Sequence, residues 1–410
     1  MRNKKGITLI ALVITIIVLL ILATVSIQAI LGENGIVNKA KKAQNQTEIG
    51  TEKEQINVAY TSCKLSNVNS VNDTVTAEEL EDEMNNSYGL GLVEVTGTEY
   101  TLTVRYVKSN RNYLILQSGI IVDLEEVLSN ATYGVAIGLA EDGSLVDMSN
   151  WNYTLITLEA KNYDSIENDV RGYVLGLESS GWNNGYKGEI VDGRIVGKMP
   201  AYILENPEGF GTGYYEDSFI PVISVAGALC YQEDLMYAPE IPNTVITLGC
   251  YVNGSGCFAG CTSLIEPPVI PNSVVEMLGA FQYCESLEKA PVIPDSVVSL
   301  ENAFRGCIDL KKAPEIPNGV EDISYAFDGC ENLLKAPIIP SSVIDMPCTF
   351  NGCSSLTGEL IINSNPRSYW AFLDGASTNE GCELILTGLS TMLQELAETG
   401  SENSNIRVEN

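Results

Sequence analysis

Cysteine is the residue type in this chain with the clearest chemical potential. The sequence contains eleven cysteines and no histidine. Thiols can form disulfides, bind metal ions or act as nucleophiles. Five cysteines follow one another at a spacing of 23 residues: Cys261, Cys284, Cys307, Cys330 and Cys353. Because no Cys-x-x-Cys pair occurs and the five share one apolar pattern, we interpret them as small buried hydrophobic residues and predict no metal site. The sequence leaves open the state of Cys63, Cys250, Cys257, Cys348 and Cys382.

The lack of histidine also limits catalysis. It removes the usual general base near neutral pH and the commonest metal ligand, so Ser-His-Asp, Cys-His and zinc–histidine sites are excluded. The sequence has no Walker A motif and no dinucleotide-binding glycine motif. The acidic run at 78–83 is typical of a solvated helix face. We therefore predict that the protein is not an enzyme and uses no cofactor.

Length and charge restrict the class of protein further. The chain has 410 residues, of which 45% are hydrophobic, enough for two or three folded domains. It carries 23 basic and 53 acidic residues, a net charge of −30. Nucleic-acid-binding proteins need a basic face that displaces phosphate counterions. Nucleic acid is therefore excluded as a partner.

The 23-residue spacing extends beyond cysteine. Phenylalanine recurs three positions before each of the five cysteines, and leucine recurs three positions after it. Each unit thus supplies one row of apolar residues that about 23 residues cannot bury alone, so the units must stack as a solenoid. The phenylalanines are Phe258, Phe281, Phe304, Phe327 and Phe350.

The repeated pattern A-F-x-x-C-x-x-L, followed by I-P-x-S-V, resembles leucine-rich repeats of the bacterial surface-antigen (BspA-like) type. The resemblance is close over residues 258–372 and looser over 228–248. It implies a short strand over the Leu-to-Ile stretch of each unit and a surface-binding role. Residues 390–400 have helical spacing and are predicted to cap the C-terminal end of the stack.

The positions just after each repeat leucine are the predicted ligand-binding site. Stacking would bring them into one extended face that is unusually rich in lysine for so acidic a chain. This pattern predicts an acidic protein or glycan partner. A solvated edge that only discourages association between sheets explains the lysines equally well. The residues concerned are Glu288, Lys289, Lys311, Lys312 and Lys335.

The N-terminus carries a second signal. Residues 7–31 contain no charged side chain and follow three basic residues, which predicts a transmembrane helix with its N-terminus in the cytoplasm. The junction Lys5-Gly6-Ile7-Thr8 resembles the leader of type IV prepilins. That resemblance implies cleavage by a prepilin peptidase between Gly6 and Ile7, followed by methylation of Ile7. Where the family usually has glutamate this chain has Ala11, which favours a membrane-held protein over a pilus subunit.

These features predict an α+β protein with an N-terminal transmembrane helix, a small pilin-like β-meander and a leucine-rich-repeat solenoid. Local signals include a capping box at Thr76-x-x-Glu79 and a hairpin turn at Asp192-Gly193. The expected segments are a leader at 1–6, a transmembrane helix at 7–31, a stalk helix with a small sheet at 32–130, a β-rich connection at 131–225 and the capped solenoid at 226–410.

Two functions are consistent with this organisation. The first is a membrane-anchored, prepilin-processed protein that presents its solenoid on the bacterial cell surface for adhesion to an extracellular protein or glycan. The second is a structural or minor pilin subunit, which would also need the pilus assembly machinery. The expected location is the cytoplasmic membrane, with a single span and most of the chain outside.

The first testable prediction concerns processing. We expect the mature chain to begin at a methylated Ile7, because the basic leader, Gly6 and apolar run stand in the order of a prepilin. Mass spectrometry of the N-terminal peptide measures this directly, with a Gly6→Val variant as the uncleaved control. An N-terminal peptide that retains Met1 in the unmodified chain would contradict the prediction.

Overall fold

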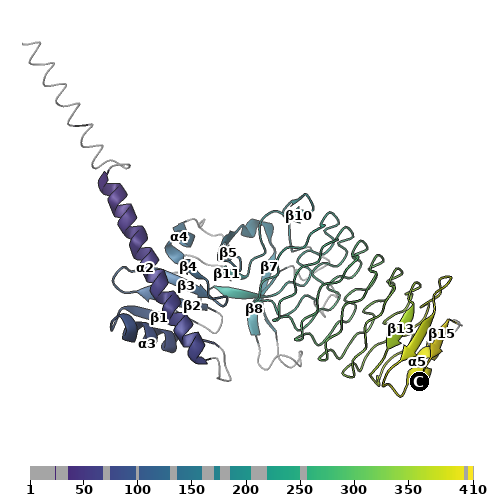
Figure 1. Ribbon diagram of the computed structural model, residues 1–410. Helices are drawn as coiled ribbons and strands as arrows, with labels where there is room; N and C mark the ends of the chain where they lie inside the picture. Colours follow the sequence, from purple (N-terminus) through teal and green to yellow (C-terminus); the bar gives the residue numbers. More distant parts are fainter. Residues whose placement is uncertain are drawn as a thin grey trace, which may run out of the picture. The chain divides into compact units, whose positions relative to one another are not determined.

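The computed structural model describes residues 24, 36–67, 74–97, 101–129, 136–158, 170–175, 185–204, 219–249, 256–400 and 405–409 (Figure 1). The chain divides into two compact units, Met1–Leu114 and Ile115–Asn410. Each unit is described by itself below.

The first unit combines helices with antiparallel strands. Its described elements are α2 (Ile36–Asn67), α3 (Ala77–Tyr88), β1 (Val93–Gly97), β2 (Thr101–Tyr106) and the start of β3 (Asn112–Leu116). Helix α3 begins at the predicted capping box. The Thr76 hydroxyl accepts a bond from the Glu79 N–H, and the Glu79 carboxylate accepts one from the Thr76 N–H.

The expected fold class needs a correction. Among the described residues no helix has the length and apolar character needed to cross a membrane. Helix α2 has 32 residues, but its sequence is rich in charged and amide side chains, which a bilayer core would not accommodate. The prediction of a fold led by a transmembrane helix is therefore wrong, and the fold is a mixed one of helices, small curled sheets and stacked repeats. Segment 7–31, except Thr24, lies outside the described residues, as do Gly6 and Ile7.

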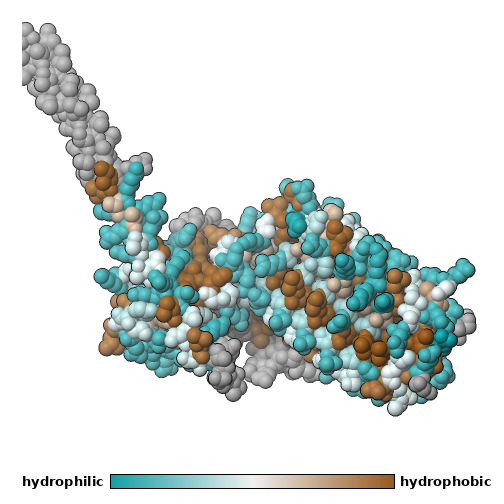
Figure 2. All heavy atoms as spheres, viewed as in Figure 1, coloured by the Kyte–Doolittle hydropathy of each residue, from teal (hydrophilic) through white to brown (hydrophobic). Residues whose placement is uncertain are grey.

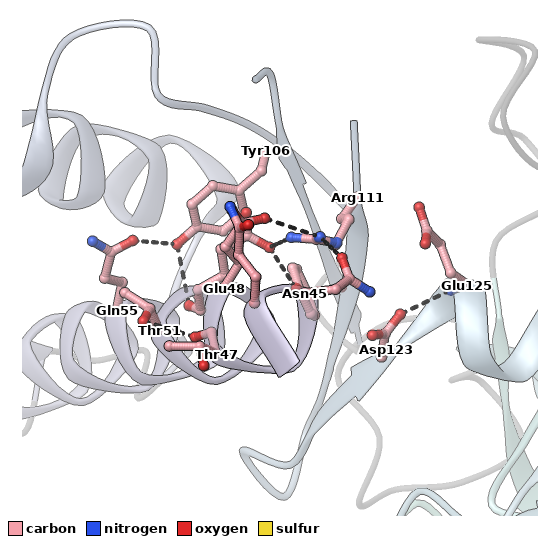
Figure 3. Close-up of polar contacts among 12 residues, drawn as sticks. Asn45, Thr47, Glu48, Thr51, Gln55, Tyr106, Arg111, Asp123 and Glu125 are labelled. Atoms are coloured by element: carbon pink, nitrogen blue, oxygen red, sulfur yellow. Dashed lines mark hydrogen bonds and ion pairs between the residues drawn. The ribbon is translucent and has the colours of Figure 1, made fainter. Parts of the chain in front are cut away.

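A buried ion pair attaches α2 to the sheet of the first unit (Figure 3). The Arg111 guanidinium lies 3.0 Å from the Glu52 carboxylate, and their side chains are only 8% and 12% exposed. Glu52 also accepts a hydrogen bond from the Tyr113 hydroxyl at 2.6 Å. The Tyr106 hydroxyl donates to the Glu52 carbonyl oxygen at 3.1 Å and to the Gln55 side chain at 2.9 Å. This network satisfies buried charges that would otherwise oppose folding.

We expect Arg111→Gln to destabilise the first unit by about 3–5 kcal/mol, because it leaves the Glu52 carboxylate buried without its counter-charge. Hydrogen exchange of the β2 and β3 amides measures the loss. Arg105→Gln is the matched control, since Arg105 pairs with Glu94 at the surface of the same sheet and such pairs contribute less than about 1 kcal/mol. Equal effects of the two variants would contradict this account.

The second unit begins with short strands that lead into the solenoid. Strand β12 (Ile220–Ser224) is parallel to β8 (Val170–Leu175), whereas β11 (Tyr202–Leu204) is antiparallel to both β12 and β5 (Ile137–Leu139). The hairpin of β9 (Ile190–Val191) and β10 (Arg194–Ile195) turns at Asp192 and Gly193, as the sequence predicts. The other elements of this part of the chain are β4 (Ile121–Asp123), α4 (Leu124–Ser129), β6 (Leu145–Val146), the 3-10 helix Met148–Asn150 and β7 (Tyr153–Leu158). The six-stranded sheet has the order β6-β5-β11-β12-β8-β7.

The solenoid consists of coils that repeat the 23-residue unit, drawn in Figure 1 as successive turns between β10 and β13. The repeat phenylalanines stack face to face, with ring centroids 5.3–5.7 Å apart and planes within 6° of parallel from Phe258 to Phe350. The repeat leucines and cysteines are fully buried beside them. The predicted row of phenylalanine, cysteine and leucine is thus the core, and each coil covers the core residues of the next coil.

The predicted strands in the repeats are replaced by single bridges. Parallel bridges join Lys289 to Lys312 and Lys312 to Lys335, but no strand longer than one bridge forms there among the described coils. The reason is proline, which cannot donate to a ladder and recurs after these positions, as at Pro291 and Pro294.

A regular ladder forms where the repeat loses these prolines. Strand β13 (Gly358–Ile361) pairs in parallel with β14 (Leu384–Thr387), and β14 pairs with β15 (Ile406–Val408). Helix α5 (Leu393–Glu398) lies in the segment predicted to cap the stack. It packs against β14 and β15 and buries Leu393 and Leu396.

Each coil also contains two sharp backbone turns. The residue two positions after the repeat phenylalanine has a positive φ, and from Phe281 to Phe350 so does the residue two positions before it. Glycine adopts this conformation freely, whereas other residues lose about 1–2 kcal/mol. The first position is glycine in most coils, at Gly260, Gly306, Gly329 and Gly352, but it is Tyr283 in one.

The five repeat cysteines form a row of free thiols inside the solenoid. Each thiol donates to a carbonyl oxygen of the preceding coil; Cys307 reaches Phe281 and Cys330 reaches Phe304, both at 3.1 Å. The cysteines therefore pack as small hydrophobic residues and also join neighbouring coils. Burial raises the pKa of the Cys307 thiol to about 12.

We expect Cys307→Ala to lower the free energy of unfolding by roughly 1–3 kcal/mol, because it removes buried volume and the bond to Phe281. The loss should depend on pH. The thiol ionises near its ordinary pKa of 9.0 once unfolded but stays protonated when folded, so its contribution is complete below pH 9 and falls as pH rises towards 12. Urea unfolding at pH 8 and pH 10 should show the difference between the two proteins shrinking by about 1 kcal/mol. Cys382→Ala, outside the row, is the control, and a difference that is constant with pH would contradict the prediction.

Candidate functional site

The structure brings three of the predicted site residues into one line. Lys289, Lys312 and Lys335 occupy the same position in consecutive coils and are joined by the parallel bridges, so we call them the lysine row. Their side chains are exposed. No ion pair joins these three lysines to another residue in the part of the chain that the structure describes.

The other two predicted residues lie beside the lysine row but neutralise each other. The Lys311 ammonium is 2.9 Å from the Glu288 carboxylate, with more than half of each side chain exposed. A surface pair of this kind contributes little to stability. Lys311 is therefore less available to a partner than the lysine row.

Exposed aliphatic side chains follow the lysines on the same coils. They stand between the two prolines of a unit, three residues after each bridge position, and we call Val269, Val292 and Ile338 the apolar row. Val269 is 88% exposed and Val292 is 86% exposed. Figure 2 shows such apolar side chains among hydrophilic ones on the surface of the solenoid. Burying one of these valines against a partner would contribute about 1.5–3 kcal/mol.

Sequence analysis missed the apolar row, although a signal was present. In the pattern P-x-I-P the isoleucine points into the core, so the residue before it must point outwards. Glu315 takes this outward position in the third coil, and Glu266 precedes the lysine row at the bridge position. The face therefore carries basic, acidic and exposed aliphatic side chains, rather than basic side chains alone.

A cleft of about 170 Å³ lies at the N-terminal end of this face. Tyr237, in its lining, forms a parallel bridge with Glu266, which occupies the position of the lysine row one coil before Lys289. The β5–β6 turn supplies Asp142, and the segment from β10 onward supplies Arg194 and Lys198. The volume is that of about five or six water molecules, enough for one small group and less than a drug-sized pocket.

Charged side chains of the cleft are largely engaged with one another. The Lys198 ammonium bonds to the Asp142 carboxylate and holds its pKa at about 2. The Arg194 guanidinium lies 4.1 Å from the centre of the Tyr237 ring. Burial raises the pKa of Glu141, which accepts a hydrogen bond from the Asn243 N–H at 3.2 Å. The lining thus offers binding contacts but no paired nucleophile and base among its described residues.

No group of three or more potential metal ligands is found among the described residues. The predicted processing residues Gly6 and Ile7 lie outside the described part of the chain. The geometry consequently provides a binding face, with the cleft at one end and the lysine and apolar rows along the coils.

Comparison with known proteins identifies the repeats. Residues 277–372 match the BspA type leucine rich repeat region in six copies. No curated protein sequence matches the chain. A leucine-rich-repeat protein of T. pallidum has a similar crystal structure, with 20% identity and a TM-score of 0.40 over 64% of this chain and 99% of that one. One from Bacteroides ovatus has 17% identity and a TM-score of 0.26, over 62% and 75%. The prepilin-like N-terminus has no such support. Residues 277–372 are therefore leucine-rich repeats of the BspA type, as the resemblance of the repeated pattern implied.

Proposed function

We propose that this leucine-rich-repeat protein acts at the bacterial cell surface and binds an acidic extracellular protein through the solenoid face. The observation that carries the proposal is the lysine row, three exposed lysines in register on a chain with a net charge of −30. Clustered charges of one sign attract a complementary partner and accelerate association.

A protein fits this face better than a uniformly charged glycan. The apolar row gives aliphatic contacts beside the lysines, and interfaces between proteins gain most of their affinity from such buried contacts. Glu266 and Glu315 would repel a polyanion with evenly spaced charges. A folded or extended protein can place carboxylates over the lysines and apolar groups over the valines.

Surface location and a non-catalytic role are parts of the same proposal. Strong net charge keeps an exported protein soluble, and the absence of histidine removes the usual catalytic base. Cleavage by a prepilin peptidase at Gly6 stays a prediction of the sequence.

A filament subunit is the second candidate. Its support is the first unit, where the long helix α2 is followed along the chain by antiparallel strands, the order expected of a pilin headpiece. Cells sheared gently release filaments, so the presence of this chain in the sheared filament fraction would favour this candidate.

The binding proposal is tested by changing Lys289, Lys311, Lys312 and Lys335 to glutamine. We expect affinity for an immobilised copolymer of glutamate and valine to fall about tenfold or more, because about 1.4 kcal/mol of charge attraction is removed. Surface plasmon resonance at low and high salt measures it, and salt should weaken the binding of the unmodified protein. The matched control changes four exposed lysines of α2, Lys39, Lys41, Lys42 and Lys64, to glutamine.

Equal affinity of the two quadruple variants would refute the lysine row as a binding site. Heparin serves as a second probe. If it binds more tightly than the copolymer and in a lysine-dependent way, the partner of this face is a polyanion and the choice of a protein is wrong.

A further inference from the structure

Aromatic side chains gather on another part of the coils, where the chain turns around the repeat phenylalanine. Tyr231 is 48% exposed, Tyr283 44% and Trp370 57%, and Tyr325 is half-buried near Trp370. We call these four residues the aromatic row. Tyr231 and Tyr283 stand two residues after the phenylalanine position of their coils, and Tyr325 and Trp370 stand two residues before it. The lysine row comes eight residues after that position. The aromatic row is therefore separate from the face described above.

The backbone at these tyrosines is unusual. Tyr231, Tyr283 and Tyr325 have φ of 58°, 59° and 55°, in the left-handed region that bulky residues rarely adopt. Other coils have glycine at the same positions, such as Gly260 and Gly279. The fold is thus formed without tyrosine there. Strained residues that the fold does not require are concentrated at functional sites.

Each of two rings rests on the backbone of the next coil. A Cβ placed on Gly306 would lie 2.4 Å from the Tyr283 ring, and one placed on Gly260 would lie 2.5 Å from the Tyr231 ring. Glycine in the following coil therefore gives the ring a flat support. With 44% of Tyr283 still exposed, the ring forms an open platform rather than part of the core.

Planar polar groups lie beside Tyr325. The Arg305 guanidinium lies 5.4 Å from the centre of the Tyr325 ring and forms an ion pair with Asp328 at 2.9 Å. The Asn351 amide donates to Asp328 at 2.8 Å. Trp370 meets Tyr325 edge to face, with ring centres 5.7 Å apart. Two rings and several hydrogen-bonding groups therefore lie close together around Tyr325.

From this arrangement we infer that the aromatic row binds a β-linked polysaccharide. A pyranose ring has an apolar face of C–H groups that stacks on an exposed aromatic ring, and a rim of hydroxyls that bonds to groups such as Arg305 and Asn351. Tyr231 and Tyr283 occupy equivalent positions two coils apart, with Gly260 between them, and two coil spacings of 5.3–5.7 Å are close to the length of two pyranose residues in an extended chain. A protein partner would also favour tyrosine, tryptophan and arginine, but usually in a compact central pocket. Two tyrosines at equivalent positions follow one another along the stack, and this arrangement favours the glycan.

Affinity electrophoresis of the full chain in gels containing barley β-glucan, xylan or glycol chitin tests the inference, with dextran as the α-linked comparison. We expect at least one β-linked polymer to retard the protein. Tyr283→Gly should reduce the retardation at least fivefold, as should Trp370→Ala. Tyr88→Ala, which removes an exposed tyrosine of α3, is the control and should leave retardation unchanged.

A second measurement separates binding from folding. Tyr283→Gly places glycine at a left-handed position, so its thermal midpoint should equal or exceed that of the unmodified chain while binding is lost. The inference is overturned if no β-linked polymer retards the protein, or if both aromatic variants are retarded like the control. Because neither the lysine row nor Lys311 is part of this surface, the variant that changes these four lysines should bind the polymer normally, and the two proposals stand or fall separately.

Discussion

Register between coils is the constraint on which the solenoid depends. One unit of 23 residues exposes its Phe–Cys–Leu row unless the next unit covers it, so coils must stack with equivalent residues in contact. Phenylalanine rings that are parallel within 6° over four successive contacts show how strictly this register is kept. The cysteine thiols add a second link, since each bonds to a carbonyl of the coil before it.

The same register places like charges next to each other. Asp322 and Asp345 are direct partners in a parallel bridge. Burial, and then the charge of Asp345, raises the pKa of the Asp322 carboxyl above its ordinary value. A carboxyl with a raised pKa binds its proton more tightly when folded, so it opposes folding at neutral pH, and this cost is lost once the pH has fallen below the pKa of the unfolded chain. Equivalence between coils therefore has an electrostatic cost wherever a charge recurs.

The sequence was sufficient for features that depend on periodicity and insufficient for those that depend on backbone detail. The spacing of Phe, Cys and Leu predicted the solenoid core, and Thr76 and Glu79 predicted a capping box. The predicted repeat strands do not form, because Pro291 and Pro294 have no N–H to donate to a ladder. The prediction of strands followed the family resemblance and gave these prolines too little weight. The lysine row followed from register alone. The apolar row could have been derived from the P-x-I-P pattern, in which Val292 precedes a buried isoleucine. The aromatic row could not, because the direction of the Tyr283 side chain depends on a positive φ that the sequence does not reveal.

Departures from the repeat fall into two groups that differ in whether a neighbour compensates them. Arg305 faces Asp328 one coil away, and Lys311 faces Glu288, so these charges cancel within the solenoid. The left-handed backbone at Tyr283, where other coils have glycine, has a conformational cost that no neighbouring residue offsets. The repulsion among the three aligned lysines of the lysine row is likewise not offset by a described ion pair. A stable repeat would eliminate both features if folding were the only requirement. Their cost is recovered when a partner supplies carboxylates to the lysines or a sugar ring to the tyrosine. Binding surfaces of a solenoid are thus best sought at positions where residues lower the stability of the fold and no neighbouring coil offsets that loss.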